Sequence, residues 1–268
     1  MKKVKVILSI FFAVFALNSC SDDSTNPSNP DYFPLLVGNY WVYEQYTLDS
    51  TNTKVAGSKI TDSAHVVSTQ NENVLTMSGV TTYKTKHTLS VGLPTEQRNY
   101  KDDNAIYQYF DQIPGLGFNL FGQNLSDLFP VDCVKLIDFK NPTWTILPAD
   151  TITIPELTLS GFRVSVKIIF NITGSKGSTK SFTVGSKNIN TQDYTLSINI
   201  TGEAKSLDIP LLPAIPLTAF SIPTHYYLAD GIGLVSMKTE SSTIKISTYF
   251  NQTLPGSEST LIRYNITK

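Results

Sequence analysis

The side chains able to do acid–base, nucleophilic or metal chemistry are few and scattered. Three histidines, His65, His87 and His225, lie far apart in the chain, each in a strand-like run. No HExxH, CxxC or GxSxG motif is present, so neither a zinc site nor a nucleophile elbow is indicated. The run Asp102-Asp103-Asn104 lacks the glycine and distal glutamate of a calcium loop, and it predicts a turn. We therefore expect no catalysis, no metal and no cofactor, although scattered carboxylates could still meet in space as a glycosidase pair.

The clearest covalent chemistry is at Cys20. Three lysines (Lys2, Lys3 and Lys5) begin the chain, an uncharged apolar stretch follows over 6–17, and Leu17-Asn18-Ser19 leads to the cysteine. This order predicts a secretory signal peptide over 1–19, whose apolar part is too short to remain as a spanning helix. The small residue before Cys20 resembles the lipobox of bacterial lipoproteins, in which the thiol is diacylated and the chain is cut before it. Asn18 departs from that pattern, because lipoboxes usually carry a small or apolar residue there.

A lipid on Cys20 predicts membrane attachment, since each buried methylene contributes about 0.8 kcal/mol. Residues 20–31 then form a disordered tether, because the segment after Cys20 is polar, contains prolines and has nothing apolar to bury. Ser21-Asp22-Asp23 resembles the acidic signals that carry some Gram-negative lipoproteins to the outer leaflet, but a merely solvated tether has the same composition. We expect an outer-membrane lipoprotein of the Gram-negative envelope, with the leaflet undecided.

The remaining charge and cysteine content exclude several partners. The formal net charge is −1 and no polybasic cluster occurs, which argues against nucleic acid and against direct attraction to lipid head groups. With Cys20 acylated, Cys133 has no cysteine left to pair with in the chain. It lies between Val131 and Val134 in an apolar run, so we expect it to be buried.

From Tyr32 onward the apolar residues alternate with polar ones, as in a sheet with one face toward a core. The apolar positions of the clearest runs are Val164, Val166, Ile168, Phe170, Ile172, Tyr194, Leu196, Ile198, Ile200, Ile244, Ile246, Phe250, Ile262, Tyr264 and Ile266. We predict a single all-β domain over 32–268, built as a large curled antiparallel sheet or incomplete β-barrel. At most one short helix is expected, over 119–128, where Phe121, Leu125 and Leu128 have helical spacing.

Polar segments rich in turn formers divide the chain into a meander. They predict turns over 49–53, 70–73, 101–104 and 174–178. Gly174-Ser175-Lys176-Gly177 could be taken for a phosphate loop, but no strand-to-helix context follows, so we interpret it as a hairpin.

Two apolar segments, 113–130 and 207–223, do not fit a plain meander. The second contains Pro210, Pro213, Pro216 and Pro223, so we expect neither a central strand nor a regular helix through it. Its low charge predicts that it lies against apolar surface. It is then either a plug at the open end of a barrel or a lid over a hydrophobic cavity.

Several short motifs resemble a family of uncharacterised bacterial envelope lipoproteins. The segment from Phe33 to Tyr43 fits its F-P-L-x-x-G-x-x-W-x-Y entry strand, and Val134-Lys135-Leu136-Ile137-Asp138-Phe139 with Trp144 is similar to a later motif. Gly231-Ile232-Gly233-Leu234-Val235 is similar to its G-x-G-L-V motif. The resemblance implies an envelope lipoprotein with a curled sheet and implies no established activity. Independently of this resemblance, the missing side chains of Gly231 and Gly233 would let an aromatic ring, or a ligand, come close to the backbone at these positions.

Two functions from different classes remain. In the first, the protein is a non-catalytic carrier or receptor for an apolar or lipid-like molecule, because ligand pockets are mostly apolar and favour barrel mouths. Its candidate ligand-binding residues are Trp41, Tyr43, Phe220, His225, Tyr226 and Tyr227. In the second, it is a structural or adhesion module on the cell surface with no small-molecule ligand. A continuous apolar cavity under 113–130 and 207–223 would favour the first.

Overall fold

We describe a computed structural model of the chain over residues 30–113, 119–120, 123–124, 133–159, 161–209, 211–247 and 250–267. Asp31–Lys268 forms one compact unit, and both hydrophobic clusters described below lie within it. The signal peptide, Cys20 and the tether up to residue 29 lie outside the described residues.

The described residues are mostly antiparallel strand, as the alternation predicts. The one helical element among them is a 3₁₀ turn, Phe110–Gln112. The strands are β1 Tyr40–Leu48, β2 Ile60–Val74, β3 Met77–Leu89, β4 Thr95–Lys101, β5 Ala105–Tyr109, β6 Asn119–Leu120, β7 Gln123–Asn124, β8 Cys133–Asp138, β9 Thr143–Leu159, β10 Phe162–Val184, β11 Lys187–Ser206, β12 Ile215–Ala229, β13 Gly233–Thr239, β14 Ser242–Ser247, β15 Phe250–Leu254 and β16 Gly256–Asn265.

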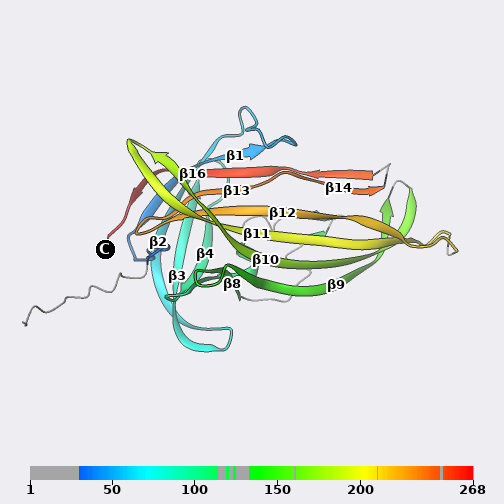
Figure 1. Cartoon of the computed structure of the whole chain (residues 1–268), viewed down its shortest axis with the longest axis horizontal. Coiled ribbons are helices and arrows are strands. Elements are labelled where there is room, and N and C mark those ends of the chain that lie inside the picture. The colour runs from blue at the N-terminus through cyan, green and yellow to red at the C-terminus, as the bar shows by residue number, and fades with distance from the viewer. Residues whose placement is uncertain are drawn as a thin grey trace, which may run out of the picture. The chain divides into compact units, whose positions relative to one another are not determined.

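Twelve of these strands form one sheet in the order β8-β5-β4-β3-β2-β1-β16-β13-β12-β11-β10-β9. Neighbours in the sheet are mostly neighbours in the chain, so the predicted meander is confirmed. In Figure 1 the long strands β9 to β12 lie side by side, and β2 to β4 cross them at a steep angle. Curling brings the two edge strands together, and the sheet is a nearly closed barrel.

The seam of this barrel lies between β8 and β9, which are at opposite ends of the strand order but are joined by residues 139–142. They share no ladder. Instead, the Trp144 indole nitrogen on β9 donates a hydrogen bond to the Leu136 carbonyl on β8, at 3.2 Å. The carboxylate of Asp138 accepts hydrogen bonds from the backbone N–H groups of Lys140 and Asn141, both at 3.0 Å, and so shapes the connecting turn.

Two hydrophobic clusters fill the unit. The larger contains Phe170, Ile172, Tyr194, Leu196 and Leu228, which occupy the inward positions of β10, β11 and β12. The smaller contains Trp41 and Val66 and also Val184 and Ile189 from the tip of the β10–β11 hairpin. Cys133 is buried, as predicted.

The turns predicted over 49–53 and 101–104 are confirmed, because β1 ends at Leu48 and β4 ends at Lys101. In each, an aspartate stabilises the turn: Asp49 accepts from the backbone of Thr51 and Thr53, and Asp102 accepts from the backbone of Asn104. The prediction of a turn over 70–73 is wrong, because β2 continues to Val74 and the chain turns at Leu75, which has a φ of 56°.

The hairpin predicted over 174–178 is also wrong. β10 runs through this segment, and the hairpin follows Val184, which pairs with Lys187. The two glycines are required by neighbouring side chains: a Cβ on Gly174 would meet Trp144, and one on Gly177 would meet Asp193. The register shifts between Lys176 and Thr179, so residues that suggest a turn produce a β-bulge instead.

The expectation that no strand crosses 207–223 is wrong for its second half, because β12 begins at Ile215 and contains Pro216 and Pro223. Ladder pairing to β13 begins only at Thr224, so both prolines lie where β12 has a ladder on the β11 side alone. They are seven positions apart in the chain, and the bulge between Leu217 and Phe220 gives both prolines the same phase relative to β11.

The first half of this segment is not packed against apolar surface as predicted. Leu211 is 97% exposed, and Ile209, Leu212 and Ile215 are exposed as well. In the other apolar segment, Asn119–Leu120 and Gln123–Asn124 pair as a two-stranded ladder, so these residues are not the expected helix. The remaining residues of 114–132 lie outside the described part of the chain.

Candidate functional site

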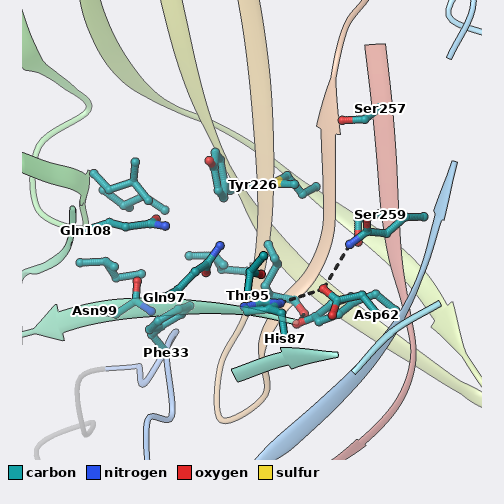
Figure 2. Close-up of a pocket in the computed structure, with 18 of the residues that line it drawn as sticks. Phe33, Asp62, His87, Thr95, Gln97, Asn99, Gln108, Tyr226, Ser257 and Ser259 are labelled. Carbon is teal, nitrogen blue, oxygen red and sulfur yellow. Dashed lines mark hydrogen bonds and ion pairs between the residues drawn. The ribbon is translucent and has the colours of Figure 1, made fainter. Parts of the chain in front are cut away.

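The candidate site is a cavity of about 350 Å³ inside the curled sheet. Its lining comes from β1 to β5, β8, β12, β13 and β16, together with Phe33 from the entry segment. Figure 2 shows the labelled side chains arranged around this space from strands on opposite sides of it. The volume lies within the range of small-molecule sites, roughly 300–1,000 Å³.

The cavity has an exposed end and a buried end. Thr95, Gln97 and Asn99 occupy alternate positions of β4, and they are exposed, half-buried and buried in that order. Ser257 is exposed and Ser259 is buried on β16, with the same two-residue spacing. Side chains two residues apart lie on the same face of a strand, so these residues line the cavity from its polar mouth into the interior.

A buried carboxylate is placed in the cavity lining by β2, whose residue Asp62 is 4% exposed. The Asp62 Oδ2 atom lies 2.8 Å from His87 Nδ1 and accepts a hydrogen bond from Gln45 Nε2 at 3.2 Å. Its Oδ1 atom is buried and has no hydrogen-bond partner among the described residues. The ladder fixes this geometry, because Asp62 pairs with Tyr43 on one side and with Leu89 on the other.

Two tyrosines add phenol groups to the same cavity. Tyr43 donates a hydrogen bond to the Leu234 carbonyl at 3.1 Å, and the Tyr226 hydroxyl is buried with no partner among the described residues. Burial, and then the negative charge of Asp62, raise the pKa of Tyr43, and burial raises the pKa of Tyr226. Both phenols are therefore neutral hydrogen-bonding groups and not anions.

The remaining walls are apolar. They are formed by Phe33, Leu89, Ile106, Leu136, Ile137, Leu228, Leu234 and Met237. Amide side chains break this surface at Gln45, Gln97, Asn99 and Gln108. The cavity is thus amphipathic, and none of its described lining residues comes from 207–223 or from 113–130.

The six ligand-binding residues predicted from sequence do not form one site. Tyr43 and Tyr226 line the cavity. Trp41 is buried in the smaller hydrophobic cluster and donates its indole N–H to the Ile232 carbonyl, with Gly233 lying close to the ring. Phe220 lines a separate surface hollow between β10, β11 and β12.

His225 and Tyr227 lie outside the cavity lining and stack with ring centroids 5.9 Å apart. The His225 ring lies 3.1 Å from Asp193 Oδ2 and 3.0 Å from Thr195 Oγ1, in both cases through Nδ1. A hydrogen bond to Asp193 raises the pKa of His225 even though burial opposes it. In a catalytic triad the two ring nitrogens of the histidine contact the nucleophile and the carboxylate separately. Here the same nitrogen of His225 makes both contacts, so the three residues do not have the geometry of a triad.

Sequence reasoning missed the polar groups that define the cavity: Gln45, Asp62, His87, Gln97, Asn99 and Gln108. One sequence pattern could have indicated them: polar residues at those alternate positions of a strand whose side chains should face the core. Thr95, Gln97 and Asn99 show this pattern in a short strand between two turns.

Comparisons with known proteins give no family. No protein-family model matches the chain, and no curated protein is similar to it. Among solved structures, a candidate lipoprotein from Parabacteroides distasonis is similar at 10% identity and a TM-score of 0.42, covering 88% of this chain and 99% of its own. A candidate exported protein with a YmcC-like fold from Bacteroides fragilis is similar at 8% identity and a TM-score of 0.38, covering 87% and 98%. At these values the likeness does not show a shared function.

Among the residues that the structure describes, no helix is both long and apolar enough to cross a membrane.

Proposed function

We propose that this protein is an exported envelope lipoprotein, anchored through acylated Cys20, that binds a small amphipathic molecule inside its curled sheet without transforming it. The observation that carries the binding proposal is the cavity, which has an exposed mouth, apolar walls and a buried polar end. Small-molecule sites combine these features, with few polar groups placed among apolar ones. The anchoring proposal rests on the lysines, the apolar stretch and the cysteine of the leader.

The outer membrane of a Gram-negative envelope remains our proposed location, on the basis of the acidic residues after Cys20. A non-catalytic role is part of this proposal, as the lack of catalytic motifs in the sequence led us to expect.

The runner-up is a surface interaction module. It is favoured by the exposed apolar residues at the β11–β12 turn, Ile209, Leu211 and Leu212. If the protein bound no small molecule in solution, this second function would be the better supported one.

The anchoring proposal predicts that Cys20→Ala leaves the signal uncut or releases the protein, and abolishes incorporation of labelled fatty acid. Acylation needs the thiol, and without it no other membrane anchor is proposed. Cys133→Ala is the matched control and should still incorporate the label. Membrane partition of Cys20→Ala that survives a high-salt wash unchanged would contradict acyl anchoring.

The binding proposal predicts that Asp31–Lys268 binds prodan, a neutral environment-sensitive dye, saturably. Gln97→Trp should weaken this binding by about tenfold or more, because the indole would occupy the half-buried part of the cavity. Glu96→Trp is the control, since this exposed neighbour lies on the other phase of β4 and does not line the cavity. Prodan fluorescence that never saturates, or equal weakening by both variants, would contradict binding in the cavity.

A further inference from the structure

The lining of the cavity contains a buried carboxylate that is incompletely satisfied. Asp62 is the one acidic residue among the described residues of the lining, and it is 4% exposed. Its Oδ2 atom is used by His87 and Gln45, whereas its Oδ1 atom has no protein partner there. Buried polar atoms are almost always hydrogen-bonded, so this oxygen indicates a donor supplied from the cavity side.

The surrounding groups indicate which kind of donor fits. No lysine or arginine is among the described lining residues, and the His87 imidazole there is already bound to Asp62, so the lining favours a cationic ligand over an anionic one. Gln45 and Gln108 each donate a side-chain N–H to the protein, to Asp62 and to the Gln112 carbonyl. The carbonyl oxygen of Gln45 therefore adds acceptor capacity beside Asp62, and that of Gln108 adds it elsewhere in the cavity.

An ammonium group suits this arrangement better than a hydroxyl. It brings three N–H donors, and it also brings the positive charge that a buried carboxylate requires to offset its desolvation. A hydroxyl supplies one donor without charge, and a carboxylate would add a second negative charge at the same end.

We infer that the cavity binds an amphipathic amine, with its ammonium group on Asp62 Oδ1 and its apolar part along walls such as Phe33 and Leu228. This inference rests on the proposed function, since it names the ligand class for the same cavity. It narrows the sequence-based hypothesis, in which the ligand was an apolar or lipid-like molecule.

The test is displacement of prodan from Asp31–Lys268 by octylamine, octanol and octanoate, which share one alkyl chain and differ in the head group. We expect octylamine to bind more tightly than octanol by about tenfold, because hydrogen bonds to charged groups contribute about 1.5–3 kcal/mol. Octanoate should be the weakest of the three. Equal affinities of the three compounds, or tightest binding of octanoate, would overturn the inference.

Asp62→Asn should remove the preference for octylamine over octanol, with both affinities referred to the prodan affinity of that variant. The chain offers a matched control in Asp193→Asn, because Asp193 also pairs with a histidine, His225, but lies outside the cavity lining. The inference would be overturned if Asp62→Asn kept its strand circular dichroism and still preferred octylamine over octanol as strongly as the wild type does. Saturable prodan binding without any head-group preference leaves the proposed function standing and refutes the amine. Absence of binding by all probes refutes both.

Discussion

Changing Gly174 to Ala should lower the free energy of unfolding by about 3 kcal/mol or more, the upper part of the range for overpacking. Gly174 lies inside β10, and a Cβ there would overlap the Cε2 and Cζ2 atoms of the Trp144 ring. The ring has little room to move, because Trp144 is 9% exposed and its indole N–H is bound to the Leu136 carbonyl across the seam. The alanine would therefore disturb the contact that holds the two edges of the sheet together.

Urea unfolding followed by tryptophan fluorescence and circular dichroism measures this loss. Ser175→Ala is the matched control, since it removes a side chain from the next position of β10 and should change stability by about 0.5 kcal/mol or less. A double-mutant cycle with Trp144→Ala tests the cause: once the indole is gone, Gly174→Ala should cost much less than in the wild type. Additive effects of the two substitutions would exclude the proposed clash.

Replacing Asp138 by Asn should destabilise the protein by about 2 kcal/mol at neutral pH. Burial alone would raise the pKa of Asp138, but hydrogen bonds from Asn141, Lys135 and Lys140 outweigh it and lower the pKa from 3.8 to about 2. A carboxyl group with a lowered folded-state pKa stabilises the fold above its unfolded pKa. That contribution is lost as the pH falls from about 4 to about 2.

The expected signature is therefore a difference in pH dependence. The wild type should lose this stabilisation between about pH 4 and about pH 2, and Asp138→Asn should lose less across the same interval. Asp49→Asn is the matched control, because Asp49 stabilises a turn in the same way but is exposed to solvent. If Asp138→Asn and the wild type lose stability in parallel on acidification, Asp138 is not the group responsible.

The fold could be predicted from the sequence largely because apolar alternation reports directly on burial. The runs around Ile168 and Ile198 became central strands with their apolar residues inward, and the polar residues at 101–104 became a turn. The same reasoning failed at Gly174 and Gly177, because glycine marks both turns and close approach of side chains. Only tertiary structure shows that Trp144 and Asp193 occupy the space beside these glycines.

The candidate site was less predictable, for a related reason. Tyr43 and Tyr226 were found through their size and position, but Asp62 and His87 are 25 residues apart in sequence and meet only because β2 pairs with β3. Alternation assigns a residue to a face of a strand. Alternation does not show that the sheet curls and encloses one of its faces around a cavity. In the sequence, polar residues that point into the cavity therefore cannot be distinguished from polar residues that face solvent.

The position of β16 has a consequence for how the protein forms. β16 lies between β1 and β13, so strands at opposite ends of the described fold are neighbours in the middle of the sheet. Until the segment Gly256–Asn265 is available, β1 to β8 and β9 to β13 are two separate meanders, and the pairing that joins them spans most of the chain. Such long-range pairing makes folding slow, because loop closure must precede the contacts that reward it. If the leader acts as the signal peptide proposed above, the sheet can be completed only after Gly256–Asn265 has crossed the membrane.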